Sequence, residues 1–140
     1  MATTAGSSRA DVELRLPAEG AYASVLRTTA AGLAARLDFT IDDIEDLRMA
    51  AGEAHAMVLA EADDGADLVC EFFLGERTLT LRMSVAATDP GRPDYESFGW
   101  QVLSTLASEV AAEADPQRFT VTLTTTSDLS AASDPPPAST

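Results

Sequence analysis

Apolar and charged residues alternate near the start of the chain, where Val12, Leu14 and Leu16 are separated by charged residues. A period of two places the apolar side chains on one face, which predicts a short half-buried strand that Pro17 closes. The apolar spacing then lengthens to three and four residues, which predicts a helix from about Ala21 to Leu37. Its apolar positions are Leu26, Ala30, Leu33, Ala34 and Leu37.

A second helix is predicted to begin after Thr40, because Thr40 and Asp43 have the spacing of a capping box. Its apolar residues recur at intervals of three and four, so one face is expected to pack on a core. That stripe contains Ile44, Leu47, Ala51, Ala54 and Val58. Glu53 and Met57 are four residues apart and off the stripe, and they stack together on another face. The segment Asp63–Gly65 ends the helix.

A hairpin is predicted next, from a strand over Leu68–Leu74, a turn at Gly75–Arg77 and a second strand with clear alternation. The apolar members of that second strand are Leu79, Leu81, Met83 and Val85. The following segment, Ala87–Glu96, contains two prolines and a glycine and is expected to be a loop.

Ser97 is predicted to cap a third helix that runs to about Glu113. One row of that helix contains Phe98, Val102, Leu106 and Val110. A last strand is indicated at Phe119–Leu123, where apolar residues alternate with threonines. The order strand, helix, helix, strand, strand, helix, strand favours a two-layer α/β sandwich with the helices on one face of the sheet.

Composition narrows the class of partner. The chain has 140 residues, which suits one domain, and a net charge of −14 in which every basic residue is arginine. Such an acidic chain is repelled by phosphate backbones and anionic lipids, so neither nucleic acid nor a membrane is expected as a direct partner, whereas a basic protein is. With one cysteine, no signal-peptide pattern and no apolar run of about 20 residues, we expect a cytoplasmic protein.

The two ends differ in composition from the middle. Residues 1–10 are rich in small and polar residues and are expected to form a disordered leader, and residues 127–140 are expected to form a disordered tail rich in proline, serine and alanine. The folded domain is therefore predicted over residues 11–126.

Several motifs, in this order, resemble the anti-sigma-factor serine kinases of the RsbW and SpoIIAB type, and in particular their divergent actinobacterial-type members. They are Leu16-Pro17, Val25-Leu26-Arg27, the run from Ile44 to Glu53 and Ala54, and the late segment Phe98-Gly99-Trp100 continuing to Val110. The resemblance covers about Val12 to Thr125. It implies an α+β fold of the GHKL ATPase (Bergerat) type, a two-layer sandwich with a mixed sheet and helices on one face.

The resemblance implies a role for the face that carries Glu53 and Met57. In this family the second helix bears Glu-x-x-x-Asn, in which the glutamate is the general base and the asparagine binds Mg²⁺. Glu53 occupies the first position, but Met57 replaces the metal ligand, and a thioether cannot serve a cation that prefers oxygen. From the residues alone, Glu53 fits a solvated helix face shared with Asp42 and Asp46.

Two further nucleotide motifs are degraded. The family's Asp-x-Gly-x-Gly, whose aspartate hydrogen-bonds adenine, has its nearest match at Asp89 and Gly91, while an ungapped alignment puts Ala87 at the aspartate position. The family's Gly-x-Gly before the last helix corresponds to Ser97 and Gly99, so one glycine is kept near the phosphate position. An ordinary Pro-Gly turn and a plain N-cap remain alternatives. Joint loss of three motifs indicates a relaxed demand for ATP, so we expect no cofactor, or ATP and Mg²⁺ if the site still binds.

Arg27 in the first helix matches the position at which family members contact the sigma factor and the anti-anti-sigma partner. Arginine suits bidentate pairing with carboxylates, although an exposed helical arginine without a role fits the residues equally. The resemblance also implies a homodimer. His55 is expected at the surface or partly packed, Cys70 is expected as a small buried hydrophobe, and neither forms a metal site. Phe98 and Trp100 are expected to pack, and Met49 and Met57 to fill gaps in the core.

The leading hypothesis is an anti-sigma factor that sequesters an alternative sigma factor by direct binding and is released by an anti-anti-sigma factor. Its alternative is an active serine kinase that phosphorylates the anti-anti-sigma factor with Glu53 as base. A third is an interaction module unrelated to sigma regulation, for example a phosphorelay accessory protein.

Overall fold

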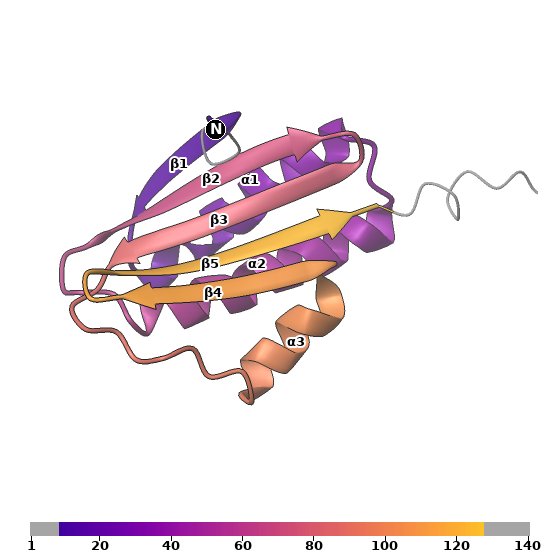
Figure 1. Cartoon of the computed structure of the whole chain (residues 1–140). Coiled ribbons are helices and arrows are strands. Elements are labelled where there is room, and N and C mark those ends of the chain that lie inside the picture. The colour runs from indigo at the N-terminus through magenta and orange to yellow at the C-terminus, as the bar shows by residue number, and fades with distance from the viewer. Residues whose placement is uncertain (1–8, 128–140) are drawn as a thin grey trace, which may run out of the picture.

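The computed structural model describes residues 9–127 (Figure 1), so the predicted leader and tail lie outside the described residues except for Arg9, Ala10 and Ser127. The elements, in order, are β1 (Val12–Pro17), the short 3-10 helix η2 (Gly20–Tyr22), α1 (Ala23–Arg36), α2 (Ile41–Leu59), β2 (Asp67–Gly75), β3 (Thr78–Ala86), α3 (Phe98–Leu106), β4 (Glu109–Asp115) and β5 (Arg118–Thr126).

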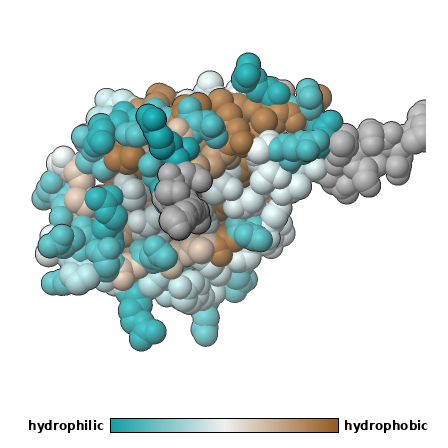
Figure 2. Space-filling model, turned by 45° about the horizontal axis from the view of Figure 1, so that its top comes forward, coloured by the Kyte–Doolittle hydropathy of each residue, from teal (hydrophilic) through white to brown (hydrophobic). Residues whose placement is uncertain are grey.

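The five strands form one sheet in the order β1-β2-β3-β5-β4. Helices α1 and α2 lie side by side behind it, and α3 lies next to α2 (Figure 1). The predicted α+β sandwich with helices on one face agrees with this arrangement. Figure 2 shows hydrophilic and neutral residues over most of the face it presents, with hydrophobic residues gathered along its upper part.

The expected mixed sheet is wrong, because all four strand pairs are antiparallel. Two tight hairpins, β2–β3 and β4–β5, set two of the pairs. The helices between β1 and β2 return the chain in the opposite direction, and the excursion through α3 and β4 does the same between β3 and β5. No connection is the single crossover that a parallel pair requires.

The predicted third helix is wrong in its second half. Helix α3 ends at Leu106, Ala107 is extended, and Glu109–Asp115 form β4. Alanine and glutamate favour a helix by propensity, but pairing of Val110 with Leu123 and of Ala112 with Val121 outweighs that preference. Burial alternates at the start of β4, where Val110 and Ala112 are half-buried and Glu109 and Ala111 are exposed.

The predicted core and both caps are confirmed. Leu26, Ala30 and Ala34 of α1 are fully buried, as is most of the α2 stripe, and Leu33, Leu37 and Ile44 pack against them from the edge. The Asp43 amide donates to Thr40 Oγ1 at 3.1 Å, and the Trp100 amide donates to Ser97 Oγ at 3.1 Å. These caps fix where α2 and α3 begin.

Cys70 is buried in β2, as expected, and burial raises the pKa of its thiol to about 12. The thiol therefore stays protonated at physiological pH and packs as a small hydrophobic group. Among residues 9–127, no helix combines the length and the apolar character that crossing a membrane requires.

Ser127 joins the end of the sheet to the start of α2. Its hydroxyl donates to Asp43 Oδ2 at 2.7 Å and accepts from the Thr40 amide at 3.3 Å, and its own amide donates to the Arg77 carbonyl at 2.9 Å. Ser127 is also buried, so the packed structure extends to the first residue of the predicted tail.

Truncation of the α2 stripe is expected to be costly. Leu47→Ala should lower the free energy of unfolding by about 2–5 kcal/mol, because the side chain is fully buried. Met49→Ala, two residues further along the same helix, should cost less than about 0.5 kcal/mol, because Met49 is 53% exposed. Urea unfolding followed by circular dichroism measures both, and equal losses would contradict the packing described here.

Candidate functional site

The start of α3 packs directly against the face of α2 that carries Glu53 and Met57. A side chain at Gly99 would place its Cβ 3.1 Å from Glu53 Oε1 and 3.6 Å from Met57 Cε. The glycine therefore permits an approach that any other residue would crowd. The fold thus brings Gly99 next to Glu53 and Met57, which lie more than 40 positions earlier in the sequence.

Local structure holds this contact in place. Glu53 and Met57 are on successive turns of α2 and both are partly buried, outside the stripe that faces the sheet. Ser97 fixes the first turn of α3 by accepting from the Trp100 amide, and its own hydroxyl donates to the Asp94 carbonyl at 3.0 Å. The N-cap interpretation of Ser97 is thus confirmed.

Beside Met57 there is a small cavity of about 210 Å³ between α2 and the loop that leads into α3. Its lining includes Met57, Glu61, Arg92, Ser97 and Phe119. Pockets that enclose a small organic ligand usually measure roughly 300–1,000 Å³, so this cavity is small for a nucleotide. The Met57 side chain contributes an apolar wall where the family resemblance expects an oxygen.

Asp89 and Gly91 do not join this cluster. Neither lines the cavity beside Met57. Asp89 is exposed with a positive φ of 48°, and its amide donates to the Pro116 carbonyl, while the Gly91 amide donates to Glu61 Oε1 at 3.1 Å. A Cβ on Gly91 would meet nothing within 4 Å. Ala87, at the ungapped aspartate position, is fully buried and offers no polar side chain.

Arg27 reaches from α1 across to α2. Its Nη1 and Cδ atoms lie 3.4 and 3.5 Å from where a Cβ on Gly52 would be. Arg27 and Glu53 line the same open groove, which has a volume of about 590 Å³. The sequence predicted Arg27 and Glu53 as separate sites and gave no role to Arg48, which also lines this groove.

The aromatic and methionine expectations hold only in part. Trp100 is half-buried and forms an edge-to-face pair with Tyr95 at 4.9 Å between ring centroids, and Met57 packs against the core, as expected. Phe98, however, is 80% exposed, and Met49 is 53% exposed. The prediction that these two residues pack is wrong, because Met49 of α2 and Phe98 of α3 both line an open groove. Within α3, only Leu103 is completely buried.

His55 is buried, with an exposed fraction of 2%, so its expected surface position is wrong. Its Nε2 has no hydrogen-bond partner within the part of the chain that the structure describes. Burial, and secondly the positive charge of Arg27, lowers the pKa of His55 from its usual 6.5. The ring is therefore neutral at pH 7. Residues 9–127 hold no group of three His, Cys, Asp or Glu side chains that suits a metal ion.

Comparison with known proteins gives a clear relationship. No protein-family model matches the chain. The serine-protein kinase RsbW of Halalkalibacterium halodurans is 37% identical over 89 residues, which cover 62% of this chain and 52% of the relative. The protein of the same name from Bacillus cereus strain B4264 is 34% identical over 82 residues, covering 57% and 49%. The chain is homologous to the RsbW serine-protein kinases. It spans about half the length of the curated relatives it matches.

Stability is expected to fall below pH 6.5 because of His55. The unfolded chain binds a proton on this residue near pH 6.5, whereas the folded state binds it only at lower pH. The contribution of neutral His55 to the free energy of unfolding is therefore fully present above pH 6.5. It is lost as the pH falls through the lowered pKa of the folded state. Urea unfolding of the wild type and His55→Gln at pH 7.5, 6.5 and 5.5 measures this. A stability difference between the two proteins that stays constant with pH would contradict it.

Proposed function

We propose that this protein is an anti-sigma factor that sequesters an alternative sigma factor by direct binding and is released by an anti-anti-sigma factor. The homology to serine-protein kinases named RsbW supports membership of this regulatory class. The single observation that favours binding over catalysis is Met57, whose thioether lies at the contact between α2 and α3. We propose that the scaffold has been kept while the kinase chemistry has been lost.

The residues present do not fit Mg²⁺. The cation requires near-octahedral oxygen coordination, and the position that would supply an amide oxygen carries a methyl thioether. Glu53 lies at the contact with Gly99 and lines the Arg27 groove, whereas the cavity beside Met57 measures only about 210 Å³. Without a divalent cation, charge on a transferred phosphoryl group is poorly neutralised, which removes a main contribution to kinase catalysis.

Arg27 supports the binding role. It projects over Gly52 into an open groove, where its guanidinium can pair with a carboxylate of a partner. The net charge of −14 suits a partner with a basic surface, such as a protein that binds DNA. The proposal also includes that the protein forms a homodimer. It further includes that the protein is cytoplasmic and does not contact nucleic acid directly.

An active serine kinase is the second candidate, because Glu53 and Gly99 lie next to each other. A kinase of this type would need a general base beside a glycine that lets the backbone approach phosphate. Titration with Mg-ATP separates the two candidates. We expect no binding tighter than about 100 μM, which corresponds to about 5.5 kcal/mol. Tighter binding, together with transfer of labelled phosphate to a serine of an anti-anti-sigma protein, would replace the first proposal by the second. Met57→Asn supplies the missing oxygen and is the matched variant.

Partner capture tests the first proposal directly. The purified chain should form a stoichiometric complex with one alternative sigma factor of its own organism, measured by co-purification with each in turn. Arg27→Ala should weaken that complex at least tenfold, or about 1.4 kcal/mol, while Arg36→Ala on the same helix should change it less than twofold. Failure of the folded protein to bind any sigma factor would reject the proposal.

A further inference from the structure

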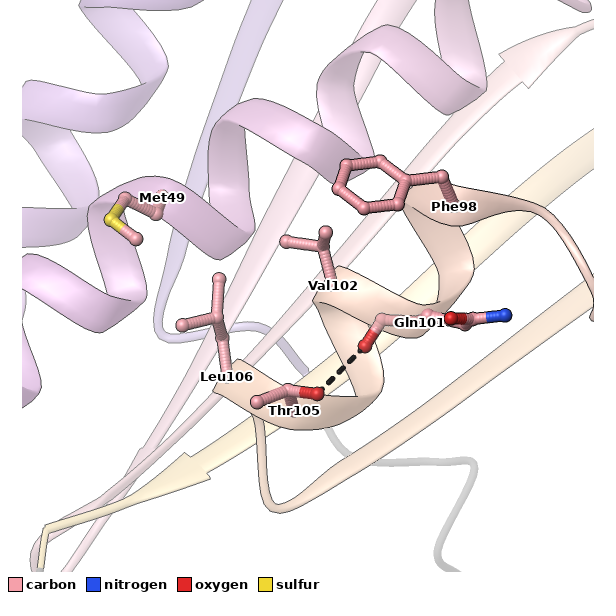
Figure 3. A pocket seen from close by; sticks show the side chains of 6 residues that line it. All are labelled: Met49, Phe98, Gln101, Val102, Thr105 and Leu106. Atoms are coloured by element: carbon pink, nitrogen blue, oxygen red, sulfur yellow. Dashed lines mark hydrogen bonds between the residues drawn. The ribbon is translucent and has the colours of Figure 1, made fainter.

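The apolar row of α3 lines an open groove, although Leu106 at its end also packs against the core. Val102 and Leu106 project toward Met49 of α2, with Phe98 at one end (Figure 3). This groove has a volume of about 280 Å³. Two of its apolar lining side chains remain exposed, Phe98 at 80% and Met49 at 53%. An exposed apolar surface of this kind in a folded domain marks an interaction site.

The groove does not suit a small polar ligand. Four of its six lining residues are apolar, and the Thr105 hydroxyl already donates to the Gln101 carbonyl at 2.9 Å (Figure 3). Few side-chain groups therefore remain to orient a bound molecule. The backbone groups of α2 and α3 are hydrogen-bonded within their helices, so an extended peptide would find no backbone partners here. A helix brings its own hydrogen bonds and presents only side chains.

Charge indicates which helix would fit. The apolar groove is continuous with the Arg27 groove, because Met49, Phe98 and Val102 line both. At that end lie Arg27 and Arg48, with Glu53 as the one acidic lining residue. Arg48 approaches Glu45 only at 3.9 Å, and both side chains are well exposed, so the guanidinium can pair with another carboxylate. A protein of net charge −14 thus presents a locally basic end beside an apolar surface.

We propose that this groove, lined by Met49, Phe98, Val102 and Leu106 and bounded by Arg48, receives an amphipathic helix of the protein partner. The row from Phe98 to Leu106 spans nine residues and an axial rise of roughly 12 Å, which matches about two turns of a docked helix. That helix carries apolar residues at helical spacing and an acidic residue that pairs with Arg48. The inference rests on the proposed function only in that the same partner also contacts Arg27.

Site-specific crosslinking tests the groove whatever the partner is. The photoreactive residue benzoylphenylalanine is introduced at Gln101 in the groove, in the full chain and in cells of its own organism. Separate variants carry it at Ser24 on α1 or at Thr122 on the open sheet face, as comparison positions outside the groove. We expect position 101 to crosslink to one partner segment that has apolar residues at helical spacing and an acidic residue within two turns. Position 122 should give no such product. Absence of a crosslink from position 101, a segment without this pattern, or a crosslink to a second copy of this chain would overturn the proposal.

Variants measure the contribution of the groove to binding of the crosslinked partner. Phe98→Ser should weaken the complex at least tenfold, whereas Ile41→Ser, on a side chain that is 77% exposed outside the groove, should change it less than twofold. Arg48→Glu should weaken binding, and replacement of the partner's acidic residue by arginine should restore it. Equal effects of Phe98→Ser and Ile41→Ser would refute the groove. A crosslinked partner that is neither a sigma factor nor an anti-anti-sigma factor would refute the proposed function and leave the groove supported.

Discussion

Helix α2 packs against α1, α3 and the central strands β3 and β5, and small residues occupy the faces where these neighbours come closest. Ala50, Ala51 and Ala54 are fully buried in the contact of α2 with the core, and Gly52 leaves room for the Arg27 side chain from α1. On a third face, Glu53 meets the backbone of Gly99. A Cβ on Gly99 would force the end of the Glu53 side chain to move by a few tenths of an ångström, whereas a Cβ on Gly52 would make ordinary van der Waals contact with Arg27. The small residues of α2, together with Gly99, therefore allow α1 and α3 to approach α2 closely.

The same feature relates the site to its proposed history. In a kinase, the face of α2 that bears the base and the metal ligand has to keep space for a nucleotide. Here the methyl group of Met57 lies against the start of α3, and only a small cavity is left beside it. In the proposed account, an apolar contact takes the place of a hydrated one. The contact of Met57 with the start of α3 then contributes to the position of the helix whose apolar residues line the groove.

Local signals predicted most of the fold. The cap at Thr40, the cap at Ser97 and the alternation in β1, β3 and β5 could be recognised because each depends on residues close in sequence. The strand β4 was missed because its alanines and glutamates favour a helix, and only pairing with β5 overrides them. The antiparallel direction of all pairs also depends on how distant elements meet.

The site was less predictable for the same physical reason. Spacing on one helix was enough to group Glu53 with Met57, but the approach of Gly99 and the reach of Arg27 are contacts between elements. His55 was expected at the surface or partly packed but is buried, because the buried sector of α2 is wide enough to include it. Phe98 was expected to pack but is exposed, because it lines an open groove.

The hydrogen bonds of Ser127 carry a consequence for how the domain can be handled. Its hydroxyl bonds to the same turn of α2 that Thr40 caps, so Ser127, which follows β5, helps to hold the first turn of the helix that carries Glu53. Shortening the polypeptide by one residue too many would fray that turn and disturb a site more than two helical turns away. Expression boundaries and fusion junctions therefore belong beyond this serine.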